Sequence, residues 1–181
     1  SQAEPSRRIG RRPRPPRRRR RRFDRPGSVE HEIDFEVFAP CGRRLPTAGE
    51  ALAYAAKHFG AFRAGSGTVY HPSPLGARFF RHVEGTRGFG RHANEFFVVV
   101  TLLQMRELTR TSFVPTRAFF AHPRPADVSE LARVVGAPLH FGDADTGIDI
   151  GRALVQAPIP TADSMLHATL DKLVRERTSD A

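Results

Sequence analysis

Just after residue 47, apolar residues recur at three- and four-residue intervals, the spacing of one face of an α-helix. Thr47 and Glu50 occupy the positions of a capping box, in which the hydroxyl accepts from the glutamate amide and the carboxylate reaches back. The apolar positions that follow are Leu52, Ala55, Ala56, Phe59 and Phe62. Gly65 and Gly67 then end the pattern, so we predict an amphipathic helix packed on a core.

A second helix is predicted over residues 90–110. The run from Phe96 to Val100 is β-branched enough to be a buried strand, but a helical repeat extends across it in both directions. The apolar positions of that repeat are Phe89, Ala93, Phe96, Val100 and Leu103. We therefore predict a largely buried helix that packs through this set.

Short β-prone runs separated by turn residues predict an antiparallel sheet. Residues 68–71 and 77–83 flank a segment with two prolines and a glycine, which is the pattern of a hairpin. Residues 116–121 form a further strand. Residues 139–141 and 147–150 flank an Asp- and Gly-rich turn, which predicts a second hairpin.

Two more helices complete the predicted fold. Asp127 as N-cap and Glu130 as N3 begin a short helix that Gly136 ends, and the last helix runs from about residue 164 to residue 177. Helices and short strands thus alternate without the long units of a parallel sheet. We predict an α+β fold, with an antiparallel sheet of short strands packed with about four helices, in one domain over residues 29–181.

The excess positive charge belongs to the first 28 residues. This segment holds 12 arginines against Glu4 and Asp24, which equals the whole formal net charge of +10, and the remainder is neutral. Six of the arginines are consecutive: Arg17, Arg18, Arg19, Arg20, Arg21 and Arg22. Because the segment contains almost nothing apolar to bury, we predict a disordered tail. The neutral body lacks the basic surplus with which DNA-binding domains recruit phosphates.

Several classes of chemistry find no support in the sequence. Cys41 is the only cysteine, which excludes an intramolecular disulfide and a Cys-rich zinc site and favours a reducing, cytoplasmic location. No segment approaches the roughly 18–20 apolar residues of a membrane span. The only lysines are Lys57 and Lys172, so the Gly-rich segment 85–90 is no P-loop.

The acidic and histidine residues form no recognisable metal or catalytic motif. Asp143, Asp145 and Asp149 lack the glycine and the closing glutamate of an EF-hand, which favours a polar turn over a calcium site. The eight histidines include no His-x-x-x-His pair. No nucleophile, base and orienting group stand in a catalytic arrangement. We predict no enzyme activity, no cofactor and no metal.

Two histidines beside aromatic residues are the candidates for a small-molecule site. His82 follows Phe80 and His122 follows Phe120, each at the end of a β-run where stacking and hydrogen bonding can hold an effector. Ordinary packing of these side chains is the alternative.

The closing helix carries a candidate dimer interface. Its apolar residues are Leu166, Leu170, Leu173 and Val174. A stripe of this length also suits docking on the helix's own domain, so both interpretations stay open.

Four short blocks of the chain carry a family resemblance. They are Leu45–Leu52, Phe120–Pro125, Pro138–Gly142 and Pro158–Asp163. In order and spacing they resemble the N-terminal regulatory domain of AraC-type bacterial transcription regulators, specifically the arabinose-binding-like group rather than the cupin-type sensor. Physically the blocks are scaffold, namely a capped helix, a strand leaving through a proline turn, a hairpin strand and a helix start.

The resemblance implies a domain that senses a small-molecule effector or mediates homodimerisation, and so controls two helix-turn-helix motifs C-terminal to it. Those motifs are not in this sequence. We therefore expect either a truncated regulator, which reaches DNA only through the absent C-terminal domain, or a stand-alone sensor. The family usually has several helices before the first block, so we expect the domain to be incomplete at its N-terminus. The alternative is a nucleic-acid-associated protein that binds through Arg17–Arg22.

Overall fold

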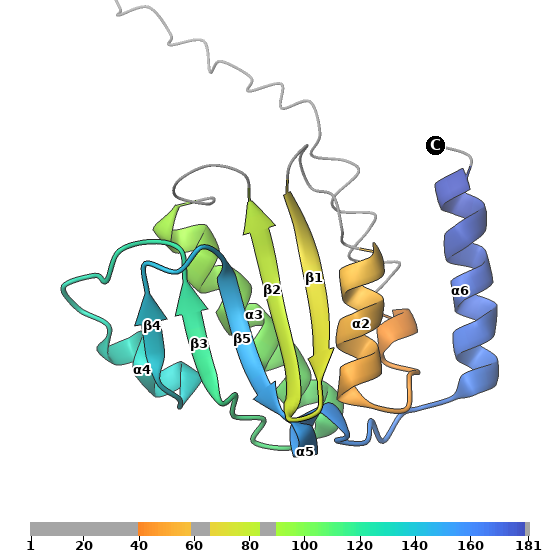
Figure 1. Ribbon diagram of the computed structural model, residues 1–181. Coiled ribbons are helices and arrows are strands. Elements are labelled where there is room, and N and C mark those ends of the chain that lie inside the picture. The colour runs from red at the N-terminus through yellow and green to blue at the C-terminus, as the bar shows by residue number, and fades with distance from the viewer. Residues whose placement is uncertain (1–39, 59–65, 84–89, 180–181) are drawn as a thin grey trace, which may run out of the picture.

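One five-stranded sheet organises the chain in the computed structural model, which describes residues 40–58, 66–83 and 90–179 (Figure 1). The strands are β1 (Ser66–Ser73), β2 (Gly76–Val83), β3 (Arg117–Phe120), β4 (Leu139–Phe141) and β5 (Thr146–Gly151). The helices are α2 (Ala48–His58), α3 (Arg91–Thr109), α4 (Ser129–Val135), α5 (Arg152–Val155) and α6 (Ser164–Ser179). The predicted α+β class is confirmed.

The strand order is β1-β2-β5-β3-β4, and every pair is antiparallel except β3 with β4. The predicted β1–β2 hairpin is confirmed, but the predicted hairpin of β4 with β5 is wrong. After β4 the chain crosses the end of β3, held by bonds from the Gly142 and Asp143 amides to the carbonyls of His122 and Phe120. This crossing places β5 between β2 and β3, where both of its edges are paired.

Helix α3 covers one face of the sheet, and the core lies between them (Figure 1). Its residues against the sheet include Phe97, Val98 and Leu102, and Phe97 stacks on Phe79 of β2 at 5.7 Å between ring centres. The predicted helix is confirmed, but its predicted packed face is wrong, since Phe96 is 69% exposed. Apolar residues surround this helix on more than one side, so two helical repeats fitted the sequence.

The helix termini follow the predicted capping chemistry with one shift. The Glu50 amide donates to the Thr47 hydroxyl at 3.3 Å, which is one half of the predicted capping box. The Glu50 carboxylate accepts from the same Thr47 hydroxyl at 3.1 Å, where the box has it accept from the Thr47 amide. Phe59 and Phe62 lie outside the described residues. Helix α4 begins one residue later than predicted, because Asp127 accepts from the Ser129 amide and hydroxyl rather than acting as N-cap.

Candidate functional site

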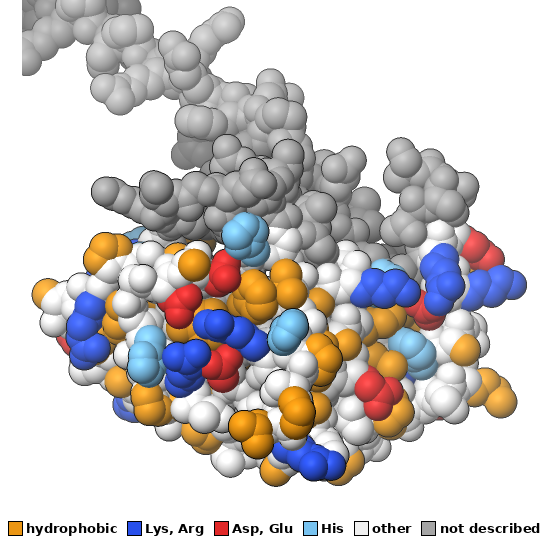
Figure 2. Space-filling model, in the orientation of Figure 1, with side chains coloured by type: hydrophobic (Ala, Val, Ile, Leu, Met, Phe, Trp, Pro, Cys, Tyr) orange, Lys and Arg blue, Asp and Glu red, His pale blue; other side chains and the backbone are white. Residues whose placement is uncertain are grey.

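The face of the sheet that α3 does not cover carries charged and aromatic side chains together. Because side chains alternate along a strand, Arg78, Phe80 and His82 of β2 point to this side while Ala77 and Phe79 point to α3. We call this side the open face. Figure 2 shows it as a mixture of basic, acidic and hydrophobic surface that is not covered by any helix of the described part of the chain.

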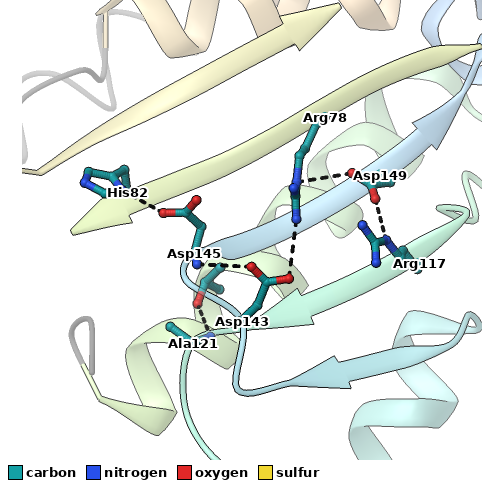
Figure 3. Close-up of polar contacts among 8 residues, drawn as sticks. Arg78, His82, Arg117, Ala121, Asp143, Asp145 and Asp149 are labelled. Carbon is teal, nitrogen blue, oxygen red and sulfur yellow. Dashed lines mark hydrogen bonds and ion pairs between the residues drawn. The ribbon is translucent and has the colours of Figure 1, made fainter. Parts of the chain in front are cut away.

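A row of charges crosses the three central strands of the open face. The register places Arg78 of β2 opposite Asp149 of β5, and Asp149 opposite Arg117 of β3. The Asp149 carboxylate accepts from Arg117 Nε at 2.5 Å and forms an ion pair with Arg78 Nε at 3.5 Å (Figure 3). Neighbouring strands hold the three groups side by side, so the carboxylate bridges two guanidinium groups.

Arg78 also lies flat over an aromatic side chain of the same face. Its guanidinium carbon is 4.0 Å from the centre of the Phe119 ring and 5.8 Å from that of Phe80. Phe119 is 0% exposed although it points away from the α3 core, because arginine side chains cover it.

The gap that admits this arginine is made by a glycine. Gly147 stands between Phe80 and Phe119 in the strand register. A Cβ atom at Gly147 would lie 2.2 Å from the Phe79 carbonyl oxygen and 2.6 Å from Phe80 Cβ, which no side chain tolerates. The absence of a side chain keeps the space between the two rings free for Arg78.

The acidic turn before β5 completes the charge pattern. The Asp143 carboxylate lies 3.5 Å from an Arg78 amino group, and the Asp145 carboxylate lies 2.7 Å from His82 Nδ1 (Figure 3). The three carboxylates that a calcium site would need thus face cationic or histidine side chains. In the ranges that the structure describes, no group of three or more metal-ligating side chains comes together.

A cavity of about 320 Å³ adjoins the row of charges, at the end of the sheet where β1 turns into β2. His71, Arg78, Thr116 and Asp149 supply polar groups to its lining, and Leu75 and Ile150 supply apolar ones. This volume lies at the lower end of the range for small-molecule sites. Hydrogen-bond donors, acceptors and apolar surface thus meet in its lining.

The four residues predicted to hold a ligand fall on two sides of the sheet. Phe80 and His82 are on the open face, and His82 is paired with Asp145. Phe120 is fully buried on the α3 side, and His122 is 4% exposed. The two pairs therefore do not meet in one pocket.

His122 belongs to a buried polar cluster between β3 and α3. Its Nδ1 lies 3.5 Å from the Asn94 amide nitrogen, and its Nε2 lies 3.5 Å from the Glu95 carboxylate. The rings of Phe120 and Phe141 meet its ring edge to face. Burial lowers the pKa of His122, opposed by the charge of Glu95, so the neutral ring is favoured.

The charged row of the open face was not found from sequence. Its members stand in three strands far apart in the chain, and the correct strand order is needed to bring them together. The available signal was a charged residue inside an otherwise apolar strand, at Arg78 and at Asp149.

Helix α6 contacts α2 and the segment before it through polar side chains. These lie next to the apolar residues that were predicted as a dimer interface. The Tyr54 hydroxyl of α2 donates to the Asp171 carboxylate at 3.1 Å, and His167 Nδ1 lies 3.1 Å from the Cys41 carbonyl oxygen. Leu166 and Leu170 are half-buried and Leu173 is 51% exposed, while the side chain of Val174 lies outside the described residues. Arg17–Arg22 also lie outside them.

The profile of a family described as the arabinose-binding domain of AraC transcription regulators, N-terminal, matches residues 34–159. The chain belongs to this family. The match spans more than half of the sequence and confirms the resemblance carried by the four sequence blocks. The family is described as part of transcription regulators, so the chain is a domain of the regulatory kind.

A solved structure supports the same fold. The chain is similar to the transcriptional regulator CdpR from Pseudomonas aeruginosa, with a TM-score of 0.57 and 18% sequence identity. The match covers 75% of this chain but 45% of CdpR, so the chain spans less than half of that protein. No curated protein matches the sequence. Among the described helices, none is long and apolar enough to cross a bilayer.

Proposed function

We propose that this chain is the effector-sensing domain of an AraC-type transcription regulator and that its effector binds on the open face. The observation that carries the proposal is the row Arg78–Asp149–Arg117 beside the 320 Å³ cavity. A polar small molecule can replace the internal ion pairs there with contacts of its own, while Leu75 offers apolar surface in the lining of the cavity. Phe80 and His82, which the sequence offered as ligand contacts, lie on the same face but do not line this cavity, and their role in binding stays a prediction.

A route from the cavity to the closing helix supports a regulatory role. Ile150 lines the cavity one residue before the end of β5, and α5 begins right after this strand with an Arg152 amide that donates to the Leu75 carbonyl at 3.0 Å. The chain then bridges to Thr47 through Pro158 and continues into α6. In the family the DNA-reading motifs lie beyond this helix, so an effector that prefers one placement of α6 biases how they are presented.

A thermal-shift screen of polar metabolites tests the proposal. A ligand at a hundred times its dissociation constant adds about 2.7 kcal/mol to the free energy of unfolding. We expect the ligands found to stabilise the wild type and the control Arg133→Ala, an exposed position on α4, but not Arg78→Ala or Thr116→Val. Equal stabilisation of all four proteins, or none from a broad library, would count against binding on the open face.

A second candidate function rests on the tail. All of the net positive charge lies in residues 1–28, and arginines there can neutralise phosphates whatever the body does. Deleting residues 1–28 and measuring duplex DNA binding over a salt series separates the two functions. Binding that survives the deletion with an unchanged salt slope would exclude the tail as a nucleic-acid arm.

A further inference from the structure

The lining of the cavity on the open face contains one charged group of each sign. Arg78 and Asp149 are the charged residues, and His71, Ser73 and Thr116 supply the other polar side chains. With histidine neutral, the formal charge of the lining is therefore zero. A ligand with a net charge would be left without an opposite charge to balance it, which is costly once water is displaced.

The ion pair between Arg78 and Asp149 is loose. Arg78 Nε lies 3.5 Å from Asp149 Oδ1, and among the described residues this buried nitrogen has no hydrogen-bond acceptor (Figure 3). The contact of the same guanidinium with the Asp143 carboxylate is also 3.5 Å long. By contrast, the second oxygen of Asp149 accepts from Arg117 at 2.5 Å. Arg78 therefore keeps donor capacity for a ligand, and Asp149 Oδ1 keeps acceptor capacity.

Thr116 adds a hydroxyl to the same part of the cavity. Its amide donates to the Asp149 backbone carbonyl at 2.7 Å, which fixes Thr116 beside Asp149 immediately before β3 begins. A hydroxyl donates as well as accepts, so it suits either group of a charged ligand. The cavity thus offers a cationic donor, an anionic acceptor and a neutral group next to them.

We propose that the effector of the open face is a zwitterion whose ammonium and carboxylate groups are attached to one carbon, that is, an α-amino acid. This inference rests on the proposed function, since it assigns a ligand class to the same cavity. The ligand carboxylate accepts from Arg78 and Thr116, and the ligand ammonium donates to Asp149. The two charges of the ligand and the two of the protein then alternate in sign, so each charge has opposite charges as its neighbours.

Ligands of other charge suit the lining less well. A simple carboxylate satisfies Arg78 but brings its charge close to Asp149 and Asp143, and like charges that face each other are destabilising. A simple amine meets the same difficulty at Arg78. A polyol avoids this repulsion, but without a charge of its own it adds no Coulomb attraction to either side chain.

The apolar part of the lining favours an aliphatic side chain on the amino acid. Leu75, in the turn between β1 and β2, is 87% exposed although it lines the cavity. An aliphatic group packed on Leu75 removes both surfaces from water. The volume of about 320 Å³ lies at the lower end of the range for ligand sites and agrees with a ligand of amino-acid size. We therefore expect leucine-like amino acids to bind better than acidic or basic ones.

Isothermal titration calorimetry with ligands of one carbon skeleton tests the ligand class. L-leucine carries both charges, 4-methylpentanoate lacks the ammonium group, and 3-methylbutylamine lacks the carboxylate. Xylitol represents the polyols. We expect leucine to bind the full chain with a dissociation constant at least about tenfold lower than that of each other compound. Equal binding of any of these compounds overturns the proposal, and so does the lack of binding by every aliphatic amino acid up to about 10 mM.

Asp149→Asn tests which residue recognises the ammonium group. The substitution keeps the shape of the side chain and removes its charge. We expect leucine to bind at least about fivefold more weakly and 4-methylpentanoate to bind more tightly, because the repulsion at this position is gone. Arg133→Ala, an exposed position on α4, is the matched control and should bind both as the wild type does. An unchanged order of the two ligands in Asp149→Asn contradicts the proposal.

The ligand series on the wild type needs no variant, so it decides the proposal even if Asp149→Asn does not fold, which circular dichroism checks. Failure of this inference also differs from failure of the proposed function. If a carboxylate or a polyol binds in preference and Arg78→Ala abolishes that binding, the open face is the effector site and the ligand class is wrong. If leucine binds the wild type and Arg78→Ala equally, the effector site lies elsewhere and both proposals fail.

Discussion

The guanidinium of Arg78 rests 4.0 Å above the ring of Phe119, on a face of the sheet that no described helix covers. The guanidinium covers the ring as an apolar side chain would in a core, and Phe119 has no exposed surface. The same arginine forms ion pairs with Asp143 and Asp149. Arg78 therefore both covers Phe119 and binds the two carboxylates.

Two substitutions separate these contributions of Arg78. Arg78→Ala uncovers Phe119 and removes both ion pairs, and we expect it to lower the free energy of unfolding by about 1–2 kcal/mol. Arg78→Met keeps an apolar cover over the ring and should cost less than half of that. Urea denaturation at neutral pH measures both. If methionine is as destabilising as alanine, the ion pairs rather than the cover hold the face together.

The lack of a side chain at Gly147 should be indispensable. A Cβ atom there would collide with the Phe79 carbonyl oxygen and with Phe80, both part of a paired strand that cannot move aside cheaply. We expect Gly147→Ala to destabilise the domain by about 2–3 kcal/mol. Gly42→Ala is the matched control, since no atom lies within 4 Å of its Cβ position. Equal unfolding midpoints for the two variants would show that the strands separate more easily than the contacts indicate.

Stability should fall in mild acid because of His122. Above the ordinary histidine pKa of about 6.5, the ring is neutral in both the folded and the unfolded chain. Below that pH the unfolded chain takes up a proton first, since burial lowers the pKa of His122 in the fold. The free energy of unfolding therefore decreases as the pH falls from about 6.5 toward the folded pKa.

The comparison protein for this prediction is His122→Gln, which cannot titrate. We expect a smaller loss of stability between pH 7 and pH 5 in the variant than in the wild type, measured by urea denaturation at each pH. His58, whose pKa burial also lowers, accounts for part of the remaining slope. Parallel pH profiles for the two proteins would contradict a role for His122.

Helix α6 should open independently of the sheet. Its described contacts with α2 are centred on the Asp171 carboxylate, which accepts from Tyr54 at 3.1 Å and lies 3.9 Å from His58 Nε2. We expect Tyr54→Phe and Asp171→Asn to speed hydrogen exchange of α6 amides several-fold while the β2 and β5 amides stay protected. Lys172→Ala, which removes an exposed pair with Glu176, is the control and should change neither.

Local features of the fold were predictable, and distant pairings were not. The Thr47 cap, the β1–β2 turn and the extent of α3 depend on neighbouring residues, which the sequence displays directly. The place of β5 depends on the crossing at Gly142, whose positive φ of 77° has no strong local signature beyond the glycine itself. The charged row could not be predicted for the same reason, because the strand order is needed to see that Arg78 and Asp149 are neighbours.

The face of α3 was misassigned for a different reason. Phe96 and Leu103 satisfy the helical repeat as well as the buried set around Phe97 and Leu102 does, so periodicity alone did not decide between them. Packing against the sheet determines which face of α3 is buried, because Phe97 stacks on Phe79 of β2.

The central position of β5 also governs how the domain forms during synthesis. Until Gly151 has emerged from the ribosome, the β1–β2 hairpin and the β3–β4 pair are separate pieces, each with an unpaired edge facing the gap. Pairing of β5 with β2 spans more than sixty residues of sequence, a long-range closure of the kind that slows folding. A nascent chain of this protein therefore stays open to mispairing until its last strand arrives.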